Sequence, residues 1–370
     1  MSDDVYGAPR ELARGEVPAP ILSYQPPVPE RPGEWPIGVI GCGGITRNHL
    51  AAYRQAGFCV VALSSRSLQR ATALRDEFFP EAAIFEDWRA LLRREDIHVV
   101  DVTTHPEVRA PIIEAALRGG KHVLSQKPLA LDLPTAERLV GIAEQSNRKL
   151  AVNQNGRWAP HFAWMREAVS AGLIGDVSSV DFAVHWDHHW ICGTPFEQVS
   201  DLLLADFAIH WFDLACCFFG DRMARSVFAA SARSPSQRAK PPFLAHACVE
   251  FERGQATFAF NADTAFGHED RTTIVGACGT LRSVGPSLLE QRVTLHSAEG
   301  SSAPELAGNW FREGFIGTMG ELLCSLEQRR EPLNAARTNL RSLALCFAAV
   351  RSASEGLPRD LTRYPALPTG

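Results

Sequence analysis

Residues 37–50 read IGVIGCGGITRNHL, which joins a short apolar strand to a glycine-rich turn and the first turns of a helix. Glycines let a backbone approach a pyrophosphate closely, and the free N–H groups and positive dipole end of the following helix favour an anion. The stretch therefore predicts a phosphate-binding turn of the dinucleotide type. The residues expected to contact the cofactor here are Gly41, Gly43, Gly44 and Ile45.

One position of this turn departs from the dinucleotide-binding pattern. The third glycine position holds Thr46, so the packing of the helix against the strand must tolerate a larger residue. A glycine-rich turn also occurs in ordinary strand-to-helix connections. The prediction therefore depends on the segments that follow.

Length, charge and cysteine content restrict the classes of protein to consider. The 370 residues are enough for two domains, and the net charge of −5 combines both signs, so we expect no nucleic-acid partner and no membrane association. The nine cysteines show no metal-ligand spacing, no apolar run could span a bilayer, and the acidic start does not resemble a signal peptide. These features predict a cytoplasmic protein in a reducing compartment.

Residues 1–36 form a proline-rich segment that cannot build a core by itself. Two interpretations stay open: a disordered tail, or an arm that lies across its own domain or a neighbouring subunit. The apolar residues that could anchor such an arm are Ile21, Leu22, Tyr24 and Trp35.

Residues 37–152 alternate strands with helices, which predicts a dinucleotide-binding (Rossmann) domain with a doubly wound parallel sheet. Where NAD-binding folds carry an acidic residue for the ribose 2′-hydroxyl, the second strand ends in Ser65 and Arg66. Because no carboxylate repels a 2′-phosphate there and a guanidinium is offered, the sequence favours NADP over NAD. The alternative is that Arg66 is a solvated charge and Ser67 only caps the next helix.

Gln126, Lys127 and Pro128 leave the carboxyl end of the strand at residues 122–124, where open α/β sheets bind their ligands. Proline holds the preceding residue extended, so the Lys127 ammonium can be directed into the crevice, although an ordinary surface lysine is the alternative. The cofactor contacts predicted at this edge are Thr104, His105, Gln126 and Lys127.

Residues 153–370 change in character, with many segments that read as strands joined by hairpins. They predict a substrate-binding and oligomerisation domain of the α+β class with a large, predominantly antiparallel open sheet. One face of such a sheet packs on helices and the other is free. We therefore expect a homodimer or homotetramer through this sheet, possibly with the N-terminal arm.

Residues 201–220, DLLLADFAIHWFDLACCFFG, are apolar nearly all round and predict a buried helix. Asp206, His210 and Asp213 interrupt it at helical spacing along one side. Buried polar groups are costly unless they are bonded, so this row either closes a structural network or faces a wet cleft. A carboxylate one turn from a histidine, in a chain with a nucleotide site, favours the cleft.

Two other segments supply candidates for a substrate site. A long strand predicted over residues 177–190 would place His185, Asp187 and His189 on one face, where they could ligate zinc. A substrate rim is favoured over that possibility, and no metal is predicted. Residues 155–161 either line the cleft or buttress it. The predicted substrate contacts are Lys127, Asn155, Arg157, Trp158, Asp187, His189, Asp206 and His210.

Several motifs together resemble the glucose-fructose oxidoreductase and inositol dehydrogenase family (Gfo/Idh/MocA) over nearly everything after residue 36. They are GCGGI at 41–45, QKP at 126–128, GLIGDV at 172–177, the pair Asp206 and His210, and the turn at 277–281. The resemblance implies that Lys127, Asp206 and His210 catalyse reversible oxidation of a sugar or cyclitol hydroxyl. The chain departs at Gln126, where the family usually has Glu, and at Arg109, where it often has His. Loss of the acid removes a neighbour that would hold Lys127 protonated.

The predicted reaction is hydride transfer between a secondary carbinol carbon and the nicotinamide. His210 accepts the hydroxyl proton, Lys127 bonds the same oxygen, and Asp206 orients the pair, while either Lys127 or His210 could be the formal base. Two other functions stay open. One is a redox-neutral, glycosidase-like enzyme that re-reduces its own substrate, and the other is a non-catalytic NADP-binding sensor.

Overall fold

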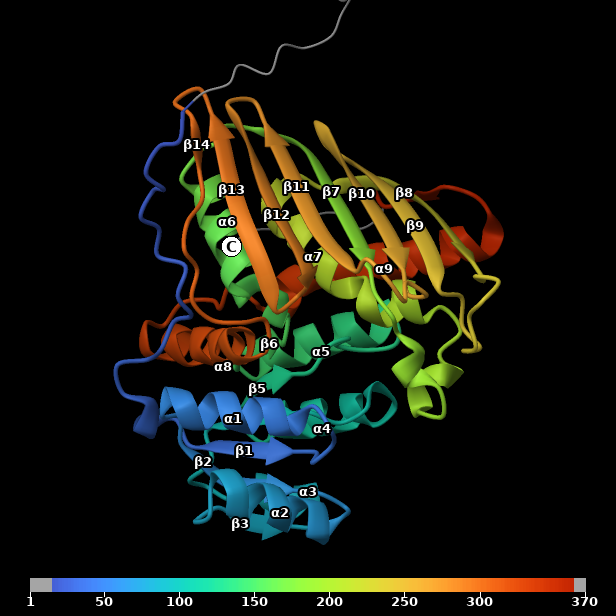
Figure 1. Ribbon diagram of the computed structural model, residues 1–370. Coiled ribbons are helices and arrows are strands. Elements are labelled where there is room, and N and C mark those ends of the chain that lie inside the picture. The colour runs from blue at the N-terminus through green and yellow to red at the C-terminus, as the bar shows by residue number, and fades with distance from the viewer. Residues whose placement is uncertain (1–14, 363–370) are drawn as a thin grey trace, which may run out of the picture.

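The computed structural model describes residues 15–362, and one half of the molecule is built on a six-stranded parallel sheet (Figure 1). The strand order is β3-β2-β1-β4-β5-β6, and each neighbouring pair is parallel. Crossovers in this order place helices on both faces, so the predicted doubly wound sheet is confirmed. The strands are β1 (Ile37–Ile40), β2 (Val60–Ser64), β3 (Ala83–Phe85), β4 (Val99–Val102), β5 (His122–Ser125) and β6 (Leu150–Val152).

Local capping marks the ends of several helices that connect these strands. The Ser67 side chain accepts a hydrogen bond from the Arg70 N–H at the start of α2, and Asp132 accepts one from the Thr135 N–H at the start of α5. Gly57 ends α1 in the left-handed region, at a φ of 71°. The helices are α1 (Thr46–Ala56), α2 (Leu68–Phe78), α3 (Trp88–Leu92), α4 (Pro106–Arg118) and α5 (Leu133–Gln145).

The other half holds a nine-stranded sheet in the order β14-β13-β12-β11-β7-β10-β9-β8-β15. Within residues 15–362 its β7–β10 pair is parallel and its other pairs are antiparallel, which confirms the predicted class. The strands are β7 (Val177–His185), β8 (Ala224–Ala232), β9 (Leu244–Phe251), β10 (Gly254–Asn261), β11 (Glu269–Gly276), β12 (Gly279–Ser287), β13 (Glu290–Ser297), β14 (Ser301–Ser302) and β15 (Arg359–Asp360).

Helices cover one face of the nine-stranded sheet and leave its other face open (Figure 1). Burial in β9 alternates from residue to residue, as a sheet with one covered face requires. On the covered face, Phe258 stacks on Phe182 at 5.2 Å and meets Phe212 edge to face at 4.8 Å. The covering helices are α6 (Pro160–Ser170), α7 (Ile209–Phe219) and α9 (Ala336–Glu355).

Helix α8 (Arg312–Glu327) lies between the two sheets, beside α1 (Figure 1). Its Phe315 and Met319 belong to the same buried cluster as Ile37 of β1 and Leu124 of β5. Burial of such side chains contributes about 1.5–3 kcal/mol each. A helix from the last part of the chain therefore completes the core of the first sheet.

Residues 15–36 of the proline-rich segment lie along their own chain, as the blue ribbon in Figure 1 shows. A parallel bridge joins the start of this arm to β14. The backbone N–H groups of Glu30 and Arg31 both donate to the Glu327 carboxylate of α8, at 3.0 and 2.9 Å. The described part of the segment is thus an arm across its own chain, and residues 1–14 lie outside the described residues.

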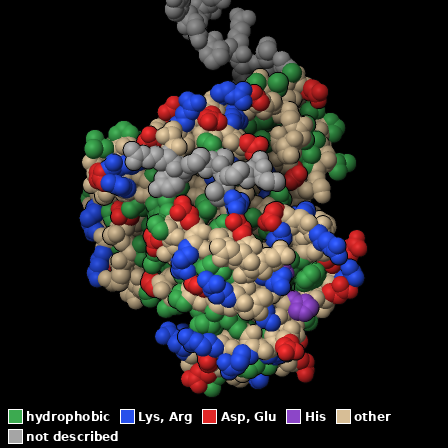
Figure 2. All heavy atoms as spheres, turned by 180° about the vertical axis from the view of Figure 1, so that it is seen from behind, with side chains coloured by type: hydrophobic (Ala, Val, Ile, Leu, Met, Phe, Trp, Pro, Cys, Tyr) green, Lys and Arg blue, Asp and Glu red, His purple; other side chains and the backbone are tan. Residues whose placement is uncertain are grey.

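Basic and acidic side chains are interspersed over the face of the molecule shown in Figure 2. That face therefore presents no continuous field of one sign. Across residues 15–362, no helix combines the length and the apolar character needed to cross a membrane.

We expect Glu327→Gln to loosen the arm, because a neutral amide oxygen accepts two N–H groups less well than a carboxylate does. The free energy of unfolding should fall by about 1 kcal/mol, and backbone hydrogen exchange at residues 30 and 31 should accelerate. A matched control is Glu331→Gln, whose carboxylate pairs with Lys149 instead. Equal exchange rates in the two variants would show that the contact does not hold the arm.

Candidate active site

The glycine-rich turn has the geometry of a phosphate-binding turn. Gly41 adopts a φ of 109°, and a Cβ placed there would lie 2.9 Å from Thr103 Oγ1 and 3.0 Å from Thr104 N. Only glycine fits this position without strain. A Cβ on Gly43 or Gly44 would meet nothing within 4 Å. The open side of these two residues is where an incoming phosphate has room.

Thr46, the departure from the dinucleotide pattern, is fully buried at the start of α1. Its hydroxyl donates to Gly41 O at 3.1 Å and lies 3.0 Å from Thr103 Oγ1. Thr103 Oγ1 in turn donates to the same carbonyl at 2.8 Å. The larger residue is therefore accommodated by hydrogen bonds that fix the turn, rather than by the close packing that a glycine would permit.

The surroundings of this turn fit a dinucleotide. Helix α1 has no side-chain cap at Ile45. Because the Thr46 and Asn48 N–H groups donate to Gly43 O and Ile45 O, an anion would be met by the N–H groups of the glycine-rich turn before them. Thr104 Oγ1 is buried without a hydrogen-bond partner, as a group that awaits a ligand would be. His105 is exposed at the start of α4 and makes no capping bond. These residues leave both space and unused donors at the carboxyl edge of the sheet.

The end of β2 agrees with both interpretations of residues 65–67. Ser67 caps α2, and the Ser65 hydroxyl accepts a hydrogen bond from the Ser67 N–H at 3.1 Å. Arg66 is exposed next to them. The guanidinium is thus open to solvent, where a 2′-phosphate could reach it.

Lys127 and Asp206 meet across the two halves of the molecule. The Lys127 ammonium lies 3.0 Å from Asp206 Oδ2 and also donates to the Asp206 backbone carbonyl at 2.9 Å. The two side chains are 15% and 18% exposed, so the pair is largely shielded but still reaches solvent. Lys127 follows β5, whereas Asp206 belongs to the π-helical turn η5 (Leu203–Phe207).

This π-helical turn changes the single helix expected over residues 201–220. The Ala208 N–H donates to Leu203 O, five residues earlier, at 2.7 Å, and α7 begins only at residue 209. A π turn holds an extra residue, so the polar side chains do not share one side as predicted. Asp206 meets Lys127, whereas Asp213 is buried against Arg157.

His210 adjoins this pair from the first turn of α7. Its ring stands edge-on to Trp310 at a centroid distance of 5.5 Å, and its buried Nδ1 has no partner. Burial, followed by the positive charge of Lys127, holds the pKa of His210 well below its usual value. The residue keeps some exposure. At neutral pH the imidazole is therefore uncharged, and it binds a proton less readily than an exposed histidine does.

A buried polar network supports the backbone at Lys127. Gln126 Oε1 accepts the Lys127 N–H at 2.7 Å, and Gln126 Nε2 donates to His49 Nε2 at 3.2 Å. His49 Nδ1 lies 2.8 Å from Asp101 Oδ2, which also accepts the Tyr53 hydroxyl at 2.7 Å. An amide donates and accepts at once, which a carboxylate cannot do. This network gives a physical reason for Gln126 where the family usually has Glu.

Arg109 holds the same segment from another side. Its guanidinium is 2% exposed and donates to the carbonyls of Gln126, at 2.7 Å, and of Pro128. It also donates from Nε to Thr104 O at 3.2 Å. Burial lowers the pKa of Arg109 to about 10, so the group remains charged at neutral pH. In the sequence, Arg109 stood out only as a departure from the family pattern, and neither its contacts nor the His49 network was predicted. The charged Asp101 inside an apolar strand was the signal that could have revealed the network.

Three predicted substrate contacts lie in the core instead of on an open surface. The Arg157 guanidinium forms a two-pronged ion pair with Asp213, at 2.6 and 2.7 Å. Trp158 is 2% exposed, and Asn155, 4% exposed, donates to Trp310 O at 3.5 Å. Partners within the protein occupy the Arg157 guanidinium and the Asn155 amide nitrogen. In this structure they buttress α7 and the segment before α8.

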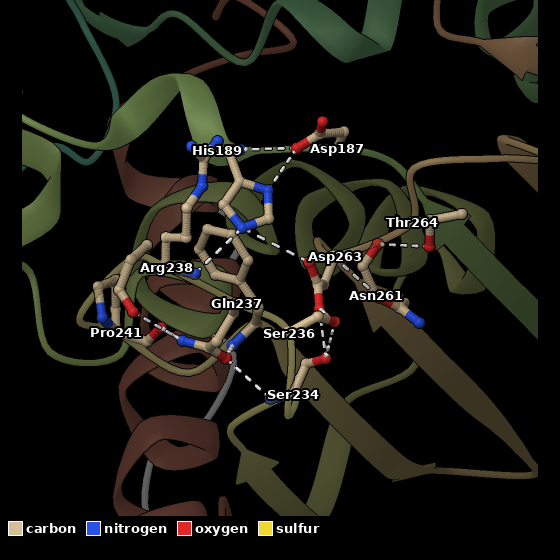
Figure 3. Close-up of polar contacts among 12 residues, drawn as sticks. Asp187, His189, Ser234, Ser236, Gln237, Arg238, Pro241, Asn261, Asp263 and Thr264 are labelled. Atoms are coloured by element: carbon tan, nitrogen blue, oxygen red, sulfur yellow. Dashed lines mark hydrogen bonds and ion pairs between the residues drawn. The ribbon is translucent and has the colours of Figure 1, made fainter.

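Asp187 and His189 do not lie on an extended strand, because β7 ends at His185. The expectation that His185, Asp187 and His189 share one face of a strand is therefore wrong. His189 Nδ1 lies 2.7 Å from Asp187 Oδ1, and its Nε2 lies 3.5 Å from Asp263 Oδ1 (Figure 3). Within residues 15–362, no three His, Cys, Asp or Glu side chains gather in a way that could hold a metal ion.

The same cluster fastens a neighbouring loop. Asp263 Oδ2 accepts the hydroxyls of Ser234 and Ser236, and the Arg238 N–H donates to His189 Nε2 at 3.2 Å (Figure 3). The pKa of Asp187 is lowered, chiefly by the His189 backbone N–H. His189 thus links the segment at Asp187 to the loop at Arg238.

Comparison with known proteins agrees with this geometry. Residues 36–154 match the model described as "Oxidoreductase family, NAD-binding Rossmann fold", and residues 162–282 match the GFO/IDH/MocA C-terminal domain. The chain therefore belongs to the Gfo/Idh/MocA family of oxidoreductases.

Individual relatives cover most of the chain. A D-apiose dehydrogenase of Paraburkholderia graminis is 28% identical over 344 residues, which are 89% of this chain and 90% of the relative. An Agrobacterium radiobacter oxidoreductase solved with NAD+, L-tartaric acid and magnesium has a TM-score of 0.80 at 23% identity, over 89% of this chain and 99% of that chain. A Lactobacillus casei scyllo-inositol dehydrogenase solved with NAD(H) and scyllo-inositol has a TM-score of 0.75 at 20% identity, over 89% and 99%.

Substitutions at two glycines should separate the fold from cofactor binding. Gly41→Ala should destabilise the protein by about 1–3 kcal/mol, because the residue adopts a positive φ and its Cβ would crowd Thr103. Gly43→Ala should leave the melting temperature nearly unchanged but weaken NADP and NAD, because its methyl group fills the open space of the turn. Thermal melting and fluorescence titration with both nucleotides measure this. Unchanged nucleotide affinity in Gly43→Ala would contradict the assignment of the turn.

Proposed function

We propose that the protein is an NADP(H)-dependent oxidoreductase that transfers a hydride between the nicotinamide and a secondary hydroxyl of a sugar, cyclitol or related polyol. The observation that carries this proposal is the meeting of Lys127, Asp206 and His210 beside the carboxyl edge of the dinucleotide-binding sheet. Relatives named as dehydrogenases of apiose and scyllo-inositol support the substrate class.

The cofactor would be held chiefly by the glycine-rich turn, with lesser contacts from Thr104 and from residues 126 and 127, and it would supply the hydride acceptor when bound. His210 is uncharged at neutral pH and accepts the proton of the substrate hydroxyl. Lys127 donates to the same oxygen and stabilises its developing negative charge. Asp206 holds the Lys127 ammonium through its carboxylate and its backbone carbonyl. The proton acceptor and the oxygen-binding donor thus come from opposite halves of the molecule.

The preference for NADP rests on Arg66 and on the lack of a carboxylate at residues 64–67. We further propose that the open face of the nine-stranded sheet meets a second copy of the chain, which would protect its exposed apolar side chains. Examples are Phe228 and Val275, 47% and 37% exposed. All nine cysteines are free, which supports a reducing, cytoplasmic environment.

The proposal is tested by a panel of aldoses, cyclitols and anhydrosugars with NADP and with NAD, followed at the absorbance of the reduced nicotinamide. Stoichiometric formation of reduced cofactor is the expected result. Turnover of a substrate without net reduced cofactor would favour the redox-neutral alternative. Nucleotide binding without turnover of any substrate would favour the sensor.

Lys127→Ala should abolish turnover and leave NADP affinity nearly unchanged, because it removes the donor to the substrate oxygen and not the phosphate turn. Steady-state kinetics and nucleotide titration measure the two effects. A matched control is Lys149→Ala, which removes a lysine paired with exposed Glu331. If Lys127→Ala keeps more than about a tenth of the rate, the role assigned to Lys127 is wrong.

Arg66→Ala should weaken NADP by about tenfold or more and leave NAD almost unaffected, since only NADP carries the 2′-phosphate that a guanidinium binds. Dissociation constants for the two nucleotides, at two salt concentrations, provide the measurement. Arg70→Ala, on the first turn of α2, is a control for the loss of one nearby positive charge. Parallel losses for NADP and NAD would argue against the contact.

A further inference from the structure

The inner face of the nine-stranded sheet carries two buried polar side chains that the mechanism does not use. Asp270 and Thr272 of β11 are each 1% exposed, and Asp270 Oδ2 and Thr272 Oγ1 have no hydrogen-bond partner. Two residues further along the same face lies Ile274, an ordinary core side chain with no exposure. The polar pair therefore stands where the fold itself requires only apolar packing.

Neighbouring polar groups do not satisfy Asp270. Gln291 Nε2 donates to the backbone carbonyl of Asp270 at 3.3 Å, and the Ser283 hydroxyl donates to Gln291 Oε1 at 2.5 Å. The adjacent Glu269 pairs with Arg271 at 3.3 Å. Burial, with a smaller contribution from Glu269, raises the pKa of Asp270 to about 7. The polar groups next to the Asp270 carboxyl group are thus bonded to other atoms.

The register of the sheet places this pair beside the aromatic wall of the active site. Asp270 lies opposite Val184 of β7 and Thr272 lies opposite Phe182. Two residues after Val184, Trp186 packs on Trp211 at a ring distance of 5.8 Å. Trp211 follows His210 directly on α7. Asp270 is therefore at the end of β11 that borders the His210 side of the molecule.

Other unpartnered polar atoms gather around that wall. Trp310 lies between the rings of His161, Trp211 and His210, at centroid distances of 6.3, 6.1 and 5.5 Å. The buried atoms without a partner there are Trp186 Nε1, His161 Nε2, His210 Nδ1 and Trp211 Nε1. A small cavity of about 10 Å³ adjoins Val184, Trp186 and Trp211, which is room for about one water molecule or one hydroxyl group. Aromatic faces edged with unused polar atoms suit a molecule that has both C–H faces and hydroxyls.

The charges near this wall indicate which polyhydroxylated molecules fit. Three cations close to it are already engaged: Lys127 by Asp206, Arg157 by Asp213, and Arg109 by backbone carbonyls. A carboxylate or phosphate held at Asp270 would face the Asp270 and Asp206 carboxyl groups. Among the described residues, Arg109 and Arg157 are bonded within the protein, and the donor that Lys127 keeps is the one assigned to the reacting oxygen. An uncharged polyol meets no such penalty.

We propose that Asp270 and Thr272 form a hydroxyl-binding subsite that selects uncharged polyols over sugar acids and sugar phosphates. This inference rests on the proposed function, because it assigns the subsite to the substrate whose reacting hydroxyl contacts Lys127 and His210. One substrate hydroxyl donates to Asp270 Oδ2, and a neighbouring hydroxyl bonds Thr272 Oγ1. Asp270 and Thr272 are specificity-determining residues, since neither touches the reacting atoms.

The test compares wild type, Asp270→Asn and Thr272→Val, each loaded with NADP or NAD. The control is Asp181→Asn, which alters a carboxylate of the same sheet that instead bonds Arg271 and Thr257. Tryptophan fluorescence titrations with myo-inositol, D-glucose and D-glucuronate report binding without requiring turnover. For any sugar that is turned over, kcat and KM are measured as well.

We expect Asp270→Asn to weaken binding of the uncharged sugars by about tenfold, because an amide presents a weaker acceptor to the hydroxyl. Thr272→Val should weaken it by a few-fold. The KM should rise while kcat, nucleotide affinity and melting temperature change little, and Asp181→Asn should behave as wild type. D-glucuronate should bind wild type more weakly than D-glucose.

Three results overturn the inference: wild-type affinity for uncharged sugars in Asp270→Asn, tighter binding of D-glucuronate than of D-glucose by wild type, or absence of any sugar binding to wild type. A purely structural role would change the melting temperature without changing KM. The proposed function fails separately: sugar binding that depends on Asp270, without turnover of any sugar, would support the subsite and remove the enzymatic assignment.

Discussion

The ion pair between Lys127 and Asp206 is the contact on which the candidate active site depends. It joins the segment after β5 of the parallel sheet to the π-helical turn before α7 in the other half. An exposed pair is worth at most about 1 kcal/mol, but shielded pairs are costly to break, because one charge is left without a partner. With side chains only 15% and 18% exposed, this pair fixes where the two halves meet.

Contacts around the ion pair fix the position of Lys127. Arg109 and Gln126 hold the backbone on both sides of Lys127, so these contacts position the ammonium together with its ion pair to Asp206. The same ammonium acts on His210, whose pKa falls through burial and through this positive neighbour. Burial is the larger of the two causes, and together they keep the imidazole uncharged. The site thus brings a fixed ammonium donor and a neutral imidazole together.

The rest of the fold stabilises this junction. Helix α8 inserts Phe315 and Met319 into the core of the first sheet, although it follows the second sheet in the chain. The N-terminal arm lies against α8 through the contacts of Glu327. Segments from both ends of the chain therefore pack where the two sheets meet, and hinge motion between the halves must work against their buried area.

The sequence by itself determined the elements and their class. Periodicity, glycines and capping residues act over a few positions, so the turn at Gly41 and the helix capped by Ser67 could be predicted locally. Asp206 and His210 were found because a polar residue in an apolar helix is conspicuous. The strand predicted over residues 177–190 was too long. Apolar and aromatic residues continue past His185, but the pairing of β7 with its neighbours stops there.

Only the tertiary structure decided which polar residues meet. Asp213 and Arg157, 56 positions apart, form a buried pair, and His49 reaches Asp101 across 52 positions. No local pattern encodes such partners, because the energy of a buried polar group depends on what surrounds it in space. The same reason explains why the π turn at Asp206 and the unpartnered Asp270 could not be read from the chain. Sequence identified the groups capable of chemistry, and packing decided which of them are bonded to the protein and which remain free for a substrate.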